Sequence, residues 1–171
     1  MILSAHSYAA YLNVTKSCSR DGSHIMLSEN FPVPAYNRPI LTIAQIIRNV
    51  ISSAAEAELT GLFICAREIF PLRQALNETG WPKPKSPIQC DNSTAVGVVN
   101  QTIISQKTKS MDIQFHWLIC RDSRYQFRYF WGTGSLNLGD YSTNNHPSIY
   151  HLSQRKIRQV ALYRPNLIQI Q

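Results

Sequence analysis

Apolar and polar positions in the first fifty residues follow the short periods that are typical of β-strands. The turn residues Arg20-Asp21-Gly22 and a loop over 29–39 that contains three prolines interrupt these runs. β-branched residues are frequent in the later runs, and helix breakers flank them. The pattern predicts four strands, over residues 3–11, 23–27, 39–44 and 46–51.

The pattern changes at Ser53, where apolar residues begin to recur at helical spacing. Ser53-Ala54-Ala55-Glu56 has the spacing of a capping box, in which the serine accepts from the Glu56 amide and the Glu56 side chain reaches back to the cap. Gly80-Trp81-Pro82 ends the pattern with residues that stop helices. The helix between these signals would bury one stripe, made of Leu59, Leu62, Phe63, Ala66, Ile69 and Phe70.

The second half of the chain alternates between the two periods. It predicts a strand over 88–90, helices over 93–100 and around 111–119, a strand over 125–131 and a short helix over 136–141. In the last strand Tyr125, Phe127, Tyr129 and Trp131 share one face, so we expect them in the core rather than on a base-stacking surface. Residues 146–171 read as a basic, irregular C-terminal tail. Strands and helices in this order predict one α/β layered domain over residues 1–145.

The composition of the chain says more about the kind of partner it could bind than about its fold. The chain has 171 residues, 44% hydrophobic and 16% charged, which fits a globular domain. A net charge of +7 suits a polyanionic partner, but a merely basic surface explains it equally well. No segment resembles a signal peptide or a membrane span, so we expect an intracellular protein, cytoplasmic or nuclear. The four cysteines are too far apart for a zinc motif, and we expect reduced thiols.

Three acids stand where elements of different type meet. Asp91 follows the apolar strand 88–90 directly, and Glu58 and Asp140 lie at comparable junctions. Separated carboxylates of this kind suggest a site for a divalent metal with hard oxygen ligands. The alternative is that each acid is a helix cap or a first-turn residue favoured by the helix dipole.

Four segments, in order, carry a family resemblance. Residues 52–59 are similar to S-S-x-x-E-A-E, 91–95 to D-N-x-x-A, 107–116 to R-T-K-x-x-D-x-R-x-H and 137–143 to N-L-A-D-x-x-T. Together they resemble Ty1/copia-type retrotransposon polyproteins over roughly residues 4–155. The resemblance implies the ribonuclease H domain of such a polyprotein. Its fold would be ribonuclease H-like, an α/β domain with a mixed five-stranded sheet and helices on its faces.

The resemblance also implies a chemistry and a substrate. In that family four acids, D-E-D-D, hold two Mg²⁺ ions at the scissile phosphate of the RNA strand in an RNA/DNA hybrid. Glu58, Asp91 and Asp140 match the second, third and fourth acids; Glu56 is set aside because the capping box already uses it. The resemblance suggests Lys107, Lys109 and His116 as nucleic-acid contacts, although a solvated helix face and a structural histidine explain them as well.

The first acid of the family is missing. Its motif H-S-D-A-S-Y corresponds here to His6-Ser7-Tyr8-Ala9-Ala10-Tyr11, so Tyr8 stands in the place of the first catalytic aspartate. A phenol with an ordinary pKa near 10 is neutral at pH 7 and a poor Mg²⁺ ligand. Asp21, beyond the expected turn, is not expected to substitute. Gly139 replaces an alanine and should weaken the helix that carries Asp140.

These departures lead to two alternatives for function. The first is a ribonuclease H-type endonuclease with impaired activity and weak or lost Mg²⁺ binding. The second is an inactive remnant that binds nucleic acid or has no retained activity. The ancestral partner, a reverse transcriptase domain, does not precede the first strand in this sequence, and we therefore expect a detached, partly degenerate piece of a retroelement.

Overall fold

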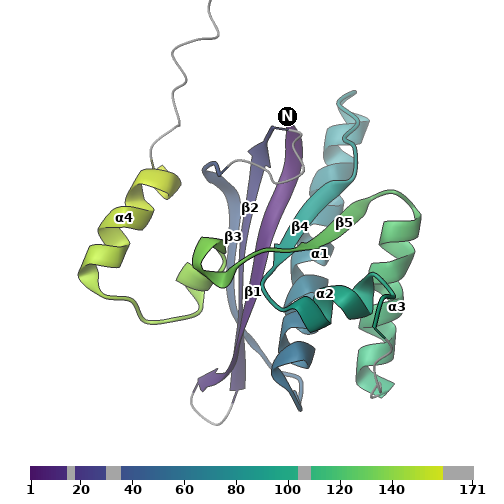
Figure 1. Cartoon of the computed structure of the whole chain (residues 1–171). Helices are drawn as coiled ribbons and strands as arrows, with labels where there is room; N and C mark the ends of the chain where they lie inside the picture. Colours follow the sequence, from purple (N-terminus) through teal and green to yellow (C-terminus); the bar gives the residue numbers. More distant parts are fainter. Residues whose placement is uncertain (15–17, 30–35, 104–108, 160–171) are drawn as a thin grey trace, which may run out of the picture.

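A computed structural model describes residues 1–14, 18–29, 36–103 and 109–159, except for the side chains of 109–112 and 159. Its centre is one sheet with the strand order β3-β2-β1-β4-β5 (Figure 1). β1 pairs antiparallel with β2 and β2 with β3, whereas β4 runs parallel to both β1 and β5. The expected mixed five-stranded sheet is therefore confirmed. The strands are β1 (Ile2–Val14), β2 (Cys18–Ser28), β3 (Pro39–Ile47), β4 (Ser86–Cys90) and β5 (Phe127–Trp131).

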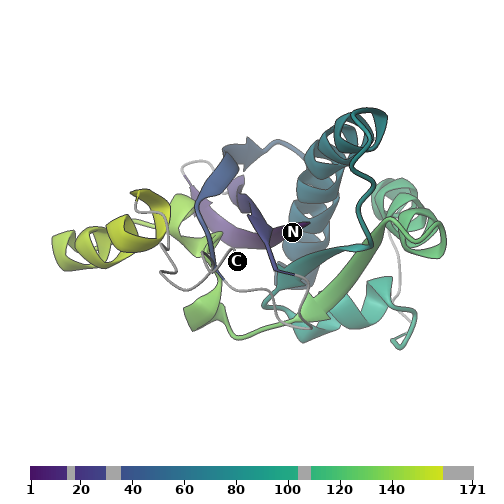
Figure 2. The same ribbon diagram turned by 90° about the horizontal axis from the view of Figure 1, so that it is seen from above.

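The helices lie on the two sides of the sheet and at its ends. α1 crosses β1 and β2 and also contacts α2 and α3, while α4 lies at the opposite side of the molecule from α3 (Figures 1 and 2). None of the described helices is long and apolar enough to cross a membrane. The helical elements are α1 (Ala54–Glu78), α2 (Ser93–Val99), α3 (Lys109–Ser123), the 3₁₀ turns η2 (Gly134–Leu136) and η3 (Asp140–Ser142), and α4 (Ser148–Gln159).

The main core lies between α1 and the sheet. Alternate residues of β1, such as Leu3 and Ala5, point towards the α1 side, as the period of two requires. α1 contributes the stripe that its sequence predicted, except that Phe63 and Phe70 are only partly buried. The largest fully buried apolar side chains are Phe127, Leu3, Ile25, Met26, Leu59, Leu62, Ile69, Ile88 and Leu118.

Both ends of α1 follow from local sequence. The Ser53 hydroxyl accepts from the Glu56 amide at 3.2 Å, as the capping box predicts. The Glu56 carboxylate also accepts from the amide of Ser52 at 2.7 Å. At the other end Gly80 adopts φ +83°, and the Trp81 amide donates to the Leu76 carbonyl at 2.9 Å. Glycine is favoured there because a left-handed residue is needed to close the helix.

Two strand predictions were wrong in their boundaries. The runs 39–44 and 46–51 form the single strand β3, which ends at Ile47. The expected turn at Arg20-Asp21-Gly22 lies inside β2, where Asp21 pairs with Ala9 and Gly22 with Tyr8. Long antiparallel pairing with β1 and β3 on either side overrides the turn preference of an Asp-Gly pair.

Three predictions in the second half also need correction. The tail was expected to be irregular, but its first part forms α4, which contacts η3 through aromatic rings of Tyr141 and Tyr150. The short helix expected over 136–141 is replaced by the separate turns η2 and η3. Tyr125 and Trp131 are 76% and 53% exposed, because Tyr125 precedes β5 with φ +57° and Trp131 ends the strand.

Candidate active site

The centre of the candidate site is a pair of carboxyl groups from α1 and the end of β4. Ligand atoms of Glu58, Cys90 and Asp91 all lie within 4.8 Å of one another. Glu58 is only 4% exposed; its Oε1 accepts from the Ala9 amide at 2.8 Å and its Oε2 from the Cys90 thiol at 3.4 Å. The structure thus brings Glu58 and Asp91 together, whereas Glu56 is bound to Ser52 at the start of α1.

The pKa values of this pair reflect burial and like charge. Burial, and then the charge of Asp91, raise the pKa of Glu58 well above its ordinary value. The pKa of Asp91 is also raised, first by burial and then, more weakly, by the charge of Asp140. Burial raises the pKa of the Cys90 thiol as well. Two adjacent carboxyl groups in such surroundings favour either a proton or a cation between them.

Asp140 lies close enough to act electrostatically on both Asp91 and Tyr8. It is the first residue of η3, and its carboxylate accepts a hydrogen bond from the Asn144 amide group. His146 Nε2 lies 3.8 Å from the second carboxylate oxygen. Asp140 therefore lies near this pair, although it is not within the tight group formed by Glu58 and Asp91.

Tyr8 is the β1 residue that lies within electrostatic range of these acids. Ser7 and Ala9 point towards Gly61 of α1, so the intervening Tyr8 points to the other side of β1, where η3 packs. Its pKa is raised, mainly by burial and to a lesser extent by the charges of Asp140, Asp91 and Glu58. The side chain is therefore a neutral phenol at neutral pH.

Two glycines bring η3 against the sheet. A Cβ on Gly139 would lie 2.6 Å from the Gly22 carbonyl oxygen, and a Cβ on Gly22 would lie 2.5 Å from the Gly139 carbonyl oxygen. The expectation that Gly139 weakens a helix was therefore wrong, because residue 139 precedes a 3₁₀ turn and packs backbone to backbone on β2. This close approach places Asp140 beside the β1–β2 hairpin.

Polar residues that sequence reasoning missed hold the segment before Asp140 onto β1. Asn137 donates to the Ser7 carbonyl at 2.7 Å, and the Leu138 amide donates to His6 Nδ1 at 3.1 Å. Burial, and then the nearby His24, lower the pKa of His6 to about 3, which keeps its ring neutral and able to accept. The only sequence signal for this role was the position of His6 two residues before Tyr8.

The donor set fits one hard divalent cation better than a bridged pair. Glu58, Asp91 and Asp140 supply carboxylate oxygens from three elements, which is the ligand type that Mg²⁺ prefers. A pair of ions at close spacing needs an anionic group that offsets their repulsion, and the β1 position offers only the neutral Tyr8. The residues present therefore do not fit the two-ion arrangement that the resemblance implies.

Asp21 does not belong to this site. It lies on β2 opposite Ala9, is fully buried, and has one carboxyl oxygen 3.1 Å from the position that a Gly61 Cβ would occupy. Burial raises its pKa to about 8, a shift that the side chain of Gln45 and, more weakly, the charge of Arg67 partly oppose. Asp21 is thus a neutral carboxyl under α1 at pH 7, one turn further along the helix than Glu58.

The expected nucleic-acid contacts are only partly described. Lys107 lies outside the described residues, and Lys109 begins α3 with a side chain that is not described. His116 is exposed on α3 and makes an edge contact with the Phe115 ring at 5.1 Å. Arg121, another basic residue of α3, stacks over the Phe70 ring at 4.2 Å and so packs α3 against α1.

Comparison with known proteins identifies the fold. No family model matches the chain, and none of the curated proteins matches its sequence. Among solved structures, a ribonuclease H1 isolated from compost by a metagenomic approach superposes with a TM-score of 0.59 at 11% identity, covering 84% of this chain and 93% of that one. The N-terminal ribonuclease H domain of a Mycobacterium tuberculosis protein gives 0.59 at 12% identity, over 84% and 97%.

A second structure of the compost enzyme was solved in complex with an RNA/DNA hybrid. It superposes with a TM-score of 0.56 at 10% identity, covering 82% of this chain and 94% of that one. At such low identity these likenesses bear on the arrangement of the backbone and not on activity. The chain has the ribonuclease H-like fold.

Proposed function

We propose that this chain is a retroelement-derived ribonuclease H-like domain that binds RNA/DNA hybrids and cleaves them weakly or not at all. The observation that carries the proposal is Tyr8, a neutral phenol on β1 within electrostatic range of three carboxyl groups. The fold supports the class of domain. The segments around Glu58, Asp91 and Asp140, which resemble Ty1/copia polyproteins, support the origin.

Each acid has a role in the proposed function. Glu58, held by the Ala9 amide, and Asp91, at the open end of β4, would be the main ligands of one Mg²⁺ ion. Asp140 would add a further negative charge on the side of the site where η3 lies. When bound, Mg²⁺ stabilises negative charge that develops on phosphate oxygens. Tyr8 adds no charge to hold a second ion, and this is the reason for weak or absent hydrolysis.

Binding of the hybrid requires fewer specific protein groups than its hydrolysis does. Recognition of an RNA/DNA hybrid rests mainly on backbone and 2′-hydroxyl contacts, for which a net charge of +7 is favourable. We extend the proposed contacts from Lys107, Lys109 and His116 to the basic residues of α4, because α4 packs against η3 next to Asp140. In this proposal residues 1–145 form the catalytic-type domain and 146–171 a basic C-terminal extension.

The test separates binding from chemistry. Purified protein and the Tyr8→Asp and Asp91→Asn variants are incubated with Mg²⁺ and a hybrid labelled on its RNA strand, and both binding and cleavage are measured. We expect all three proteins to bind the hybrid, with little cleavage by the native chain. Tyr8→Asp should raise the cleavage rate, because it restores a carboxylate among Glu58, Asp91 and Asp140.

Two outcomes would contradict the proposal. Robust Mg²⁺-dependent cleavage by the native chain that Asp91→Asn abolishes would mean an intact enzyme. Failure of the native chain to bind the hybrid at low salt would remove the nucleic-acid function altogether. Circular dichroism of each variant ensures that a loss reflects the site rather than unfolding.

A further inference from the structure

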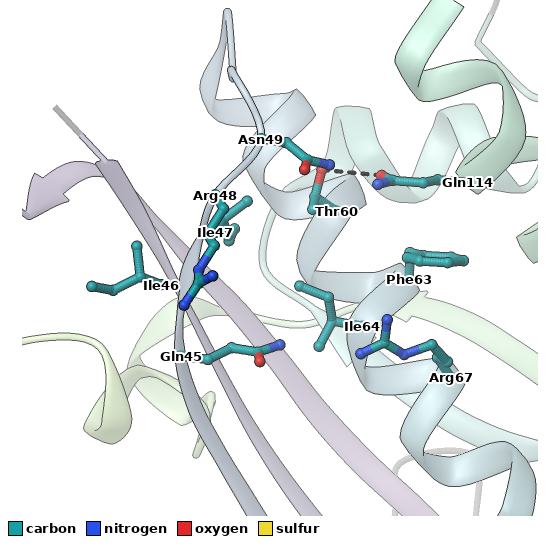
Figure 3. Close-up of a pocket in the computed structure, with 10 residues that line it drawn as sticks. All are labelled: Gln45, Ile46, Ile47, Arg48, Asn49, Thr60, Phe63, Ile64, Arg67 and Gln114. Carbon is teal, nitrogen blue, oxygen red and sulfur yellow. Dashed lines mark hydrogen bonds between the residues drawn. The ribbon is translucent and has the colours of Figure 1, made fainter.

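A groove distinct from the acidic site lies between the end of β3 and the outer face of α1. Thr60, Phe63, Ile64 and Arg67 recur at helical spacing and turn one stripe of α1 towards this groove (Figure 3). Glu58 points instead towards β1, where it meets the Ala9 amide. The cavity has a volume of about 530 Å³, within the range of sites that bind small ligands.

The walls of the groove are rich in hydrogen-bond donors and carry two cations. Arg48 enters from the segment after β3 and Arg67 from α1, and none of the described residues that line the cavity is acidic. Figure 3 shows the side chains of Gln45 and Arg67 directed towards each other across the groove. Gln114 of α3 accepts from the Thr60 hydroxyl at 3.2 Å, which leaves its amide hydrogens for a ligand.

The two arginines differ in their present partners. Arg48 is exposed and makes no hydrogen bond or ion pair with any residue in the described part of the chain. Arg67 pairs with the neighbouring Glu68 at 3.1 Å, with both side chains partly exposed. A surface pair of this kind contributes about 1 kcal/mol or less, so an anionic ligand with better geometry can replace it.

The floor of the groove, in the part of the chain that the structure describes, is apolar and carries no negative charge that would repel an anion. Ile47 and Ile64 are nearly buried beneath it, and the Arg67 guanidinium lies 5.9 Å from the centre of the Phe63 ring. The carboxyl group of Asp21 lies within electrostatic range of Arg67, and its raised pKa keeps it neutral at pH 7. The buried Asp21 carboxyl group therefore adds no negative charge near the groove at pH 7.

We propose that this groove binds the phosphate group of a ligand, with Arg48 and Arg67 holding the oxyanion and the Gln45 and Gln114 amides as further donors. Two planar guanidinium groups match the oxygens of a phosphate better than those of a single-charge carboxylate. The apolar floor beside Phe63 offers a place for the rest of a nucleotide. The proposal does not depend on hydrolysis at the acidic site.

Arginine side-chain N–H signals in ¹H–¹⁵N NMR spectra of the full chain report on this site directly. Inorganic phosphate, adenosine 5′-monophosphate and a short RNA/DNA hybrid are titrated separately at constant ionic strength. We expect saturable shifts of the Arg48 and Arg67 signals with phosphate and tighter binding of the nucleotide. Arg48→Gln and Arg67→Gln should each weaken phosphate binding by about tenfold, since each removes charge-assisted hydrogen bonds.

The matched control is Arg38→Gln, which removes an exposed arginine at the other end of β3 and should leave affinity unchanged. If the hybrid shifts the same two signals and competes with the nucleotide, the phosphate comes from a nucleic-acid strand; if it does not, the ligand is a free phosphate or nucleotide. Absence of a saturable shift at either arginine, or unchanged affinity in both variants, would overturn the proposal. Backbone spectra identify any variant that fails to fold.

Discussion

Asp21 makes the stability of this domain depend on pH in a direction opposite to that of most carboxylates. Its side chain is fully buried on β2, and neither carboxyl oxygen makes a hydrogen bond to a described residue. Burial raises its pKa from 3.8 to about 8. In the folded chain Asp21 therefore keeps its proton up to about pH 8, while in the unfolded chain it loses the proton near pH 4.

The sign of the effect follows from proton counting. Between about pH 4 and pH 8 the folded state binds one more proton than the unfolded state at Asp21, so the free energy of unfolding falls as pH rises. One pKa unit corresponds to about 1.4 kcal/mol, so three pH units within that window amount to about 4 kcal/mol. Above the folded pKa the effect is complete and no further loss is expected.

Asp21→Asn keeps the size of the side chain and removes the ionisation. Urea unfolding of both proteins at pH 5, 6, 7 and 8 gives the difference in unfolding free energy, in which the other titrating groups cancel. We expect the unfolding free energy of the variant, relative to that of the native chain, to rise by about 1.4 kcal/mol for each pH unit. Asp122→Asn, which breaks a surface ion pair with Lys85, should change stability by less than about 1 kcal/mol. A difference that does not depend on pH would refute the reasoning.

Four further outcomes follow from the same structure. Calorimetric titration with Mn²⁺ should find at most one ion per native chain, and Tyr8→Asp should raise that stoichiometry. Gly22→Ala should destabilise the chain by about 1–3 kcal/mol in urea unfolding, because the new Cβ meets the Gly139 carbonyl at 2.5 Å. His6 and His24, whose pKa values burial lowers to about 3 and about 4, stay neutral in the fold, so their own contribution to the unfolding free energy, opposite in sign to that of Asp21, should fall as pH drops from 6.5 to 4. Hybrid affinity measured by fluorescence anisotropy should fall at least tenfold between 50 and 200 mM salt if the contacts are mainly to phosphates.

Local rules predicted the elements with the strongest patterns. The capping box at Ser53 and the glycine at position 80 set the ends of α1 because each acts within a few residues. The same rules failed at Asp21-Gly22, which has turn chemistry but pairs with β1 on one side and β3 on the other. Long-range pairing decides such positions, and it leaves no mark in a window of a few residues.

In the candidate site, too, the sequence predicted some residues, whereas others depend on long-range contacts. Glu58 and Asp91 were identified from their positions at element boundaries and from the family resemblance, and they lie together. The groups that hold Asp140 in place were not identified, because Asn137 bonds to Ser7 and Leu138 to His6 across 130 and 132 positions of the sequence. Nothing in the sequence pattern links a buried histidine to a distant backbone amide.

The same structure explains why Tyr8 should separate binding from cleavage. The support for Asp140 runs through the backbone contact of Gly22 with Gly139 and through the Asn137 bond to Ser7, and neither requires a carboxylate at position 8. The support for Glu58 is the Ala9 amide, which any β1 side chain at position 8 leaves in place. The scaffold can therefore persist without the first acid, whereas catalysis by two ions cannot. A fold retained in this way keeps its surface and its charge, on which the proposed binding of a hybrid depends.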